Sequence, residues 1–144
     1  MKNSAVSFYT EDIKYVLKHK TLLKQWLVST IAQEGYALNA LNFILCSDDY
    51  LLRINQEYLD HDDYTDVITF DNSEAPKTVL GDIFISLDRI RENASLYNCS
   101  VYHELCRVMV HGTLHLLGYT DKSKTAKQEM TAKEDFYLSK LAIS

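Results

Sequence analysis

The sequence is poor in residues that interrupt a chain. Only four of its 144 residues are glycine and one is proline, and it contains no internal repeat. Long flexible linkers and low-complexity segments are therefore excluded. A chain of this length supports one hydrophobic core and is short for two, so we expect a single domain over residues 1–144.

Cysteine is also scarce. Cys46, Cys99 and Cys106 are an odd and widely spaced set without a Cys-x-x-Cys pair, a pattern typical of reduced thiols. No segment reaches membrane-spanning length without charges, and residues 1–20 lack the continuous apolar core of a signal peptide. We therefore expect a soluble cytoplasmic protein that does not contact a membrane.

Basic residues are outnumbered by acidic ones. Fifteen Lys and Arg stand against 20 Asp and Glu, which gives a formal net charge of -5. Because phosphate contacts favour a basic surface, composition gives no argument for a nucleic-acid binder, and we do not expect DNA as a partner. A role in nucleic-acid binding would therefore need a local basic patch. One candidate is the stretch of Lys14, Lys18, His19, Lys20 and Lys24, although a solvated helix face explains it about as well.

What the sequence does contain is a succession of strand-like and helix-like segments. A short apolar run predicts a strand at 5–9, and a run that alternates and then becomes fully apolar predicts one at 37–47. Apolar runs with β-branched residues predict two more, at 65–70 and 79–86. Helical spacing of apolar residues predicts helices over 21–35, 47–59, 87–97, 100–118 and 122–141. This order indicates an α/β architecture. Four aromatic residues are at core periodicity: Trp26, Phe43, Phe84 and Phe136.

The segment 106–118, CRVMVHGTLHLLG, is apolar nearly all round, which is typical of a centrally buried helix. Within it, His111 and His115 are four residues apart, so their Cβ atoms lie about 5–6 Å apart on one face. Both imidazoles can then reach one metal ion. The pair alone is weak evidence, because histidines at this spacing are more often hydrogen-bonded core or surface residues.

The residues after this helix strengthen the metal hypothesis. Gly118 can adopt the left-handed conformation that ends a helix, which would bring Asp121 back toward the histidines. The resulting H-x3-H-x5-D set leaves one position of a tetrahedral zinc ion open for water, as in catalytic sites. Such a water is acidified enough to supply hydroxide near neutral pH. Gly112 stands where an HExxH peptidase has its glutamate, which disfavours peptide hydrolysis by that route.

Glu104 precedes His111 by seven residues, two helical turns, and lies on nearly the same face. It could orient a histidine or carry a proton. An ordinary surface glutamate is equally consistent with the sequence.

With its HGTLHLLGYTD motif at 111–121, the sequence resembles the YbeY family of metal-dependent endoribonucleases and ribosomal RNA maturation factors, whose signature is HGxLHLxGYxH. The similarity continues through YLDHDDYTDVITF at 58–70, which resembles a tyrosine-led family segment ending in TDVLSF. It also includes GDIFIS at 81–86 and the helix start at Glu104, and so covers most of residues 40–137. The resemblance implies an α/β (α+β-like) fold, with a buried metal-bearing helix against a small mixed sheet.

The resemblance also implies a mechanism and partners. Its substrate would be single-stranded RNA, including ribosomal RNA, and its partners the small ribosomal subunit and assembly factors. His111, His115 and Asp121 would hold one Zn²⁺ ion that polarises the scissile phosphate. Glu104 and Arg107 would act beside the metal or on the substrate side.

Two departures from the family pattern affect this hypothesis. Asp121 replaces the usual third histidine, and its oxygen could shift the preference toward a harder metal. Leu59 stands where an arginine commonly follows the tyrosine matched here by Tyr58, which removes a natural phosphate contact. His61, two residues later, is a candidate replacement on the basis of its proximity in sequence.

Three other interpretations remain open. The protein could be a metal-dependent hydrolase of a non-nucleic substrate, which the acidic net charge and Leu59 slightly favour. It could be a non-catalytic ribosome-associated factor in which zinc pins the last helix to the core. In the third, both histidines are ordinary core residues and Asp121 belongs to the N-cap region of the last helix.

Overall fold

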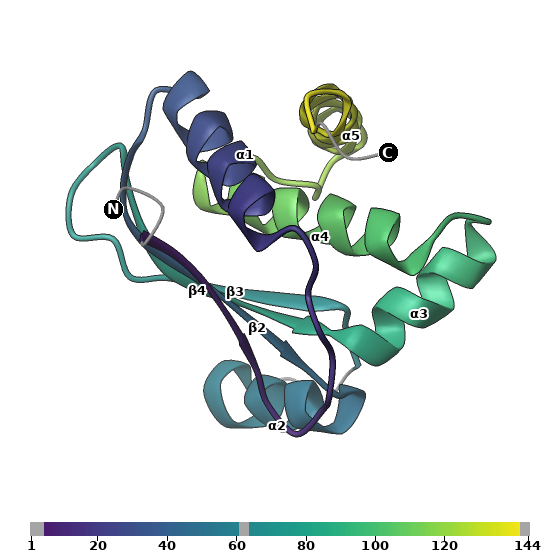
Figure 1. Cartoon of the computed structure of the whole chain (residues 1–144). Helices are drawn as coiled ribbons and strands as arrows, with labels where there is room; N and C mark the ends of the chain where they lie inside the picture. The colour runs from purple at the N-terminus through teal and green to yellow at the C-terminus, as the bar shows by residue number, and fades with distance from the viewer. Residues whose placement is uncertain (1–4, 61–63, 142–144) are drawn as a thin grey trace.

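The computed structural model describes residues 5–60 and 64–141 (Figure 1). Every strand and helix expected from the sequence is present, in the expected order. They are β1 (Val6–Thr10), α1 (Lys20–Gln33), β2 (Ala37–Cys46), α2 (Asp48–Leu59), β3 (Val67–Asp71), β4 (Thr78–Ser86), α3 (Leu87–Leu96), α4 (Val101–Leu116) and α5 (Lys124–Ser139).

The four strands form one sheet in the order β1-β2-β4-β3. The pairs β1–β2 and β2–β4 are parallel, and β3 runs antiparallel to β4. The sheet is therefore mixed, which confirms the fold class expected from the sequence. Its helices lie on both faces: α2 covers one face, while α1 and α4 cover the other with α5 beyond them (Figure 1).

Side-chain alternation along β4 divides the core between these two faces. Val79, Ile83 and Ile85 belong to the larger hydrophobic cluster, together with α1 and α4. Phe84 points the other way and packs against the smaller cluster beneath α2. Burial of both faces explains why β2 and β4 read as nearly continuous apolar runs in the sequence.

Of the four aromatic residues at core periodicity, Trp26 and Phe43 are buried and Phe84 is partly buried. The prediction that Phe136 belongs to the core is wrong, because this residue is 40% exposed. The buried residues of α5 are Met130, Glu134 and Tyr137, a stripe at helical spacing that leaves Phe136 outside it.

Helix α4 lies close to the sheet because two glycines permit it. A Cβ atom added at Gly112 would lie 3.0 Å from Ile83 Cγ2 of the sheet, and one added at Gly81 would lie 3.2 Å from Leu116 Cδ1 of α4. At the start of α4, the Ser100 hydroxyl accepts a hydrogen bond from the His103 amide. The glycines thus set the distance between α4 and the sheet, and the Ser100 cap fixes the N-terminus of the helix. The positions of the two histidines on α4 follow from both.

No helix in the described part of the chain is both long enough and apolar enough to span a membrane.

Candidate metal centre

The metal candidates lie at the C-terminal end of α4 and in the loop that follows. Gly118 has φ +100°, the left-handed conformation expected from the sequence. Its amide donates to the His115 carbonyl, and the Tyr119 amide donates to the Leu114 carbonyl. These bonds satisfy carbonyls at the helix end and turn the chain back along α4. Asp121 is thereby carried to the face that holds the histidines.

The three side chains converge on one point. Asp121 Oδ2 lies 3.7 Å from His111 Nε2 and 3.9 Å from His115 Nε2. The candidate ligand atoms all lie within 4.8 Å of one another. Ligands at 2.0–2.2 Å from a tetrahedral zinc ion are separated from each other by about 3.4 Å. Small side-chain adjustments would therefore bring all three atoms into bonding range of one ion.

Glu134 of α5 sets the orientation of His111. Its Oε2 lies 2.5 Å from His111 Nδ1, and its Oε1 accepts a hydrogen bond of 2.7 Å from Arg107. A proton on Nδ1 leaves His111 Nε2, the atom facing Asp121, with its lone pair free for a metal. Sequence reasoning missed Glu134. The available signal was a glutamate on the buried stripe of an otherwise polar helix.

The two histidines differ in basicity. Burial lowers the pKa of His111, but the hydrogen bond and charge of Glu134, together with Asp121, outweigh it, and the net pKa is raised. Burial lowers the pKa of His115, and the neighbouring His111 lowers it further. His111 therefore favours its protonated form, whereas His115 favours its neutral form.

Glu104 and Arg107 both line a cavity of about 500 Å³ beside His111 and Asp121. Glu104 is only 2% exposed, so the alternative of an ordinary surface glutamate is wrong. Burial raises its pKa, against the opposing effect of Arg107. Its Oε1 lies 3.5 Å from Arg107 Nε and has no hydrogen-bond partner among the described residues. Arg107 therefore bridges two carboxylates, Glu104 and Glu134.

A further carboxylate, Asp66, lines the same cavity from the segment before β3. Burial raises its pKa, while the charge of His111 lowers it. The backbone of Asp66 is held in place by a hydrogen bond from the Ser86 amide to the Asp66 carbonyl. Its place in the cavity was not foreseen, because it depends on how β3 pairs with β4.

The resemblance also singled out two residues near position 60, Leu59 and His61. His61 lies outside the described residues. Leu59 is the last residue of α2, on the face of the sheet opposite α4, and its side chain is 39% exposed (Figure 1). It is not among the described residues that line the metal cavity.

The model of the family described as Endoribonuclease YbeY matches residues 5–142. The chain belongs to the YbeY family. An Endoribonuclease YbeY from Cytophaga hutchinsonii is 49% identical over 139 residues, which cover 96% of this chain and 97% of the relative. One from Amoebophilus asiaticus is 41% identical and covers 96% of this chain and 94% of the relative.

A solved structure shares the fold of this YbeY-family chain. The solution structure of TM1509 from Thermotoga maritima superposes with a TM-score of 0.66 at 30% identity. The match covers 94% of this chain and 88% of that protein. The resemblance to the YbeY family found in the sequence is therefore confirmed over nearly the whole chain.

Proposed function

We propose that this YbeY-family protein is a metal-dependent endoribonuclease that hydrolyses phosphodiester bonds in single-stranded RNA. The observation that carries the proposal is the convergence of His111, His115 and Asp121 within 4.8 Å, at the edge of an open cavity. Relatives named Endoribonuclease YbeY match this chain over nearly their full length, and their name directs the proposed chemistry toward RNA.

The donor set fits a zinc ion. Two imidazole nitrogens and one carboxylate oxygen are ligands that zinc accepts, and three protein ligands leave one position open. The side chains of His111, His115 and Asp121 are 21%, 28% and 43% exposed, so a substrate can approach them. When bound there, the ion supplies Lewis-acid polarisation of a phosphate and lowers the pKa of water.

The surrounding residues have separate tasks in this proposal. Glu134 holds His111 in its metal-binding tautomer, and Arg107 fixes Glu134 through its 2.7 Å hydrogen bond. Glu104, a buried carboxylate with a raised pKa at the cavity wall, is the candidate proton carrier. His61 remains a candidate substrate contact on sequence grounds alone.

The family assignment also supports a proposal for the cellular setting. We propose that the RNA is ribosomal RNA undergoing processing or quality control in the cytoplasm, with the small ribosomal subunit and assembly factors as partners. The resemblance in sequence to ribosomal RNA maturation factors supports this assignment.

The deciding experiment combines elemental analysis with RNA cleavage on the same samples. We expect wild-type protein to carry about one zinc per chain and to cleave single-stranded RNA. Asp121→Ala should lose both properties. The exposed Asp135 of α5 provides the matched control, and Asp135→Ala should keep both.

Each alternative predicts a different result. Zinc without cleavage of any RNA would favour the ribosome-associated factor, and turnover of a non-nucleic substrate would favour the other hydrolase class. Absence of zinc from both wild type and Asp121→Ala, after purification without chelator, would refute the three-ligand site.

A further inference from the structure

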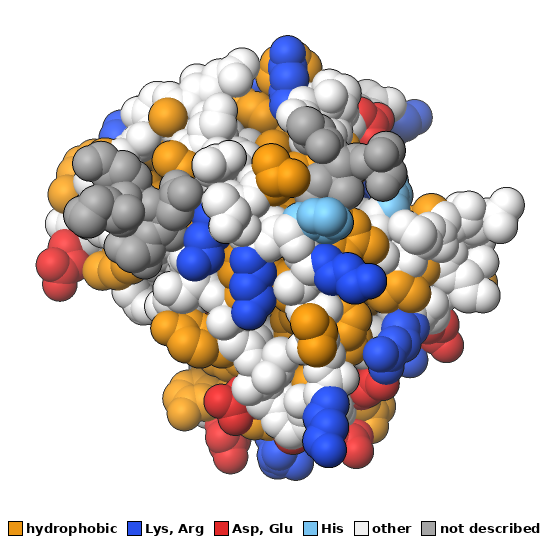
Figure 2. Space-filling model, in the orientation of Figure 1, with side chains coloured by type: hydrophobic (Ala, Val, Ile, Leu, Met, Phe, Trp, Pro, Cys, Tyr) orange, Lys and Arg blue, Asp and Glu red, His pale blue; other side chains and the backbone are white. Residues whose placement is uncertain are grey.

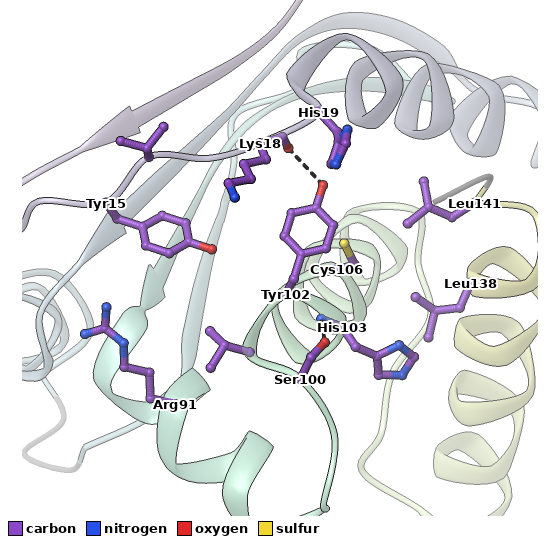
Figure 3. Close-up of a pocket in the computed structure, with 12 residues that line it drawn as sticks. Tyr15, Lys18, His19, Arg91, Ser100, Tyr102, His103, Cys106, Leu138 and Leu141 are labelled. Carbon is purple, nitrogen blue, oxygen red and sulfur yellow. Dashed lines mark hydrogen bonds between the residues drawn. The ribbon is translucent and has the colours of Figure 1, made fainter. Parts of the chain in front are cut away.

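A second cavity lies at the N-terminal end of α4 and has a volume of about 650 Å³. Four segments form its walls: the loop before α1, helix α3, the first turns of α4, and the end of α5 (Figure 3). We call it the α4 N-terminal pocket and define it by six of its lining residues: Tyr15, Lys18, Arg91, Tyr102, His103 and Leu138.

The lining of this pocket is basic although the chain is acidic. It includes Lys18, His19, Arg91 and His103, and the described residues that line it include no Asp or Glu. Neither Lys18 nor Arg91 forms an ion pair with any described acidic side chain. Figure 2 shows Lys, Arg and His side chains across the middle of this face, with acidic side chains toward its edges. The pocket thus offers uncompensated positive charge.

Hydrogen-bond donors add to this charge. The Ser100 hydroxyl accepts a hydrogen bond from the His103 amide. The Glu104 amide donates to the Ser100 carbonyl, so the amides of Val101 and Tyr102, which come before it, have no intrahelical carbonyl to bond. Both residues line the pocket. Amides at the start of a helix of 16 residues, beside Lys18 and Arg91, form an environment that favours a phosphate group.

The remaining walls are aromatic and apolar. Figure 3 shows the rings of Tyr15 and Tyr102 at the pocket, with Leu138 and Leu141 on the side of α5. The Tyr102 hydroxyl donates a 2.9 Å hydrogen bond to the Lys18 carbonyl, which holds the loop against α4. Aromatic rings beside cationic groups suit a nucleobase and its phosphate together.

Helix α4 connects this pocket with the metal centre. His103, Arg107 and His111 are spaced four residues apart, so they follow one face of the helix. His103 lines the α4 N-terminal pocket, whereas Arg107 and His111 line the metal cavity. Eight residues of helix span about 12 Å, a distance that a few nucleotides of a single strand can cover.

We propose that the α4 N-terminal pocket binds a nucleotide of the same RNA strand whose scissile phosphate lies at the metal centre. This inference rests on the proposed function, because it takes single-stranded RNA as the substrate. It also divides the basic stretch of the sequence: Lys18 and His19 line the pocket, whereas Lys14 and Lys24 do not.

The test compares two double variants with the same change in charge. Lys18→Ala with Arg91→Ala removes the pocket cations, and Lys14→Ala with Arg53→Ala removes two exposed cations outside it. Binding of fluorescein-labelled oligouridine to the zinc-loaded protein is recorded by stopped-flow anisotropy, in the phase that precedes cleavage. Zinc content and thermal unfolding verify that both double variants are folded and metal-loaded.

We expect the pocket double variant to bind oligouridine roughly 20-fold more weakly than wild type at about 0.1 M salt, with a salt slope smaller by about 1.4, as for two lost phosphate contacts. The control double variant should stay close to wild type. A 4-thiouridine probe should crosslink to the peptides that contain Tyr15 or Tyr102.

Equal effects of the two double variants, or no effect of either, would overturn the proposal. Binding of inorganic phosphate that depends on Lys18 and Arg91, without a matching effect on oligouridine, would also overturn it and assign the pocket to a small phosphate compound. Failure of the proposed function has a different signature: the metal-loaded wild type cleaves no RNA.

Discussion

At the scale of single residues, the centre is defined by one hydrogen bond as much as by its candidate ligands. His111 can present Nε2 to a metal because Glu134 engages its Nδ1, and Arg107 in turn engages the other oxygen of Glu134. The three ligand candidates were predictable from the sequence because they lie within eleven residues on one helix and its turn. Glu134 was not, because it comes from another helix whose docking no local pattern specifies.

Glu134→Gln should weaken zinc binding by roughly 10-fold or more, because the neutral amide stabilises a metal-bound His111 less well. Competition with a chromophoric chelator would measure the affinity. Glu129→Gln, an exposed substitution on the same helix, is the matched control. An unchanged zinc affinity in a folded Glu134→Gln protein would show that Glu134 does not orient the ligand.

At the scale of elements, a second carboxylate secures the loop that carries Asp121. Glu34 at the end of α1 accepts hydrogen bonds of 2.8 Å from Tyr119 and 3.0 Å from Lys133, and a further short one from Tyr137. Tyr36 adds a 2.8 Å bond to the Leu117 carbonyl. The turn between α1 and β2 therefore joins α5 to the residues around Gly118.

Glu34 should make the stability of the protein depend on acid pH. Burial raises its pKa, but the hydrogen bonds from Tyr137, Lys133 and Tyr119 outweigh this and lower the pKa below its ordinary value of 4.5. A lowered folded-state pKa stabilises the protein above pH 4.5, and this stabilisation is lost as the pH falls through the folded pKa. Urea unfolding at a series of acid pH values would measure how the free energy of unfolding falls with pH. We expect a smaller fall for Glu34→Gln than for wild type, and an unchanged fall for Glu129→Gln.

The contact between β3 and β4 depends on Gly81. An added Cβ would lie 2.5 Å from the Phe70 carbonyl oxygen, so the two backbones would have to separate. Gly81→Ala should lower the free energy of unfolding by about 1–3 kcal/mol, as overpacking does. Urea denaturation would measure this. A variant as stable as wild type would mean that the strands separate without penalty.

At the scale of the whole molecule, the sequence predicted every helix and strand of the described chain, because most have a clear apolar period and recognisable ends. Ser47, Ser86 and Ser100 all accept hydrogen bonds from the first turns of their helices. The contents of the cavity were less predictable. Asp66, Glu104 and Glu134 come together through strand pairing and helix docking, which are contacts between residues distant in the sequence.

Removal of the metal should destabilise the protein without unfolding it. An ion present at a thousandfold its dissociation constant contributes about 4 kcal/mol, which corresponds to roughly 10 °C in the unfolding midpoint. The hydrophobic clusters on the two faces of the sheet include none of the three ligand candidates, so they should persist without the ion. Calorimetry before and after chelation would test this. Complete unfolding on chelation would contradict it and favour a structural zinc.

The order of elements has a consequence for synthesis of the protein. All described strands precede residue 87, whereas α4, which covers Ile83 and much of the same face, begins at Val101. A domain folds as a unit, and the chain emerges during synthesis from its N-terminus. A nascent chain therefore exposes an apolar sheet surface until α4 has left the exit tunnel. During that interval, chaperone capture and aggregation compete with completion of the fold.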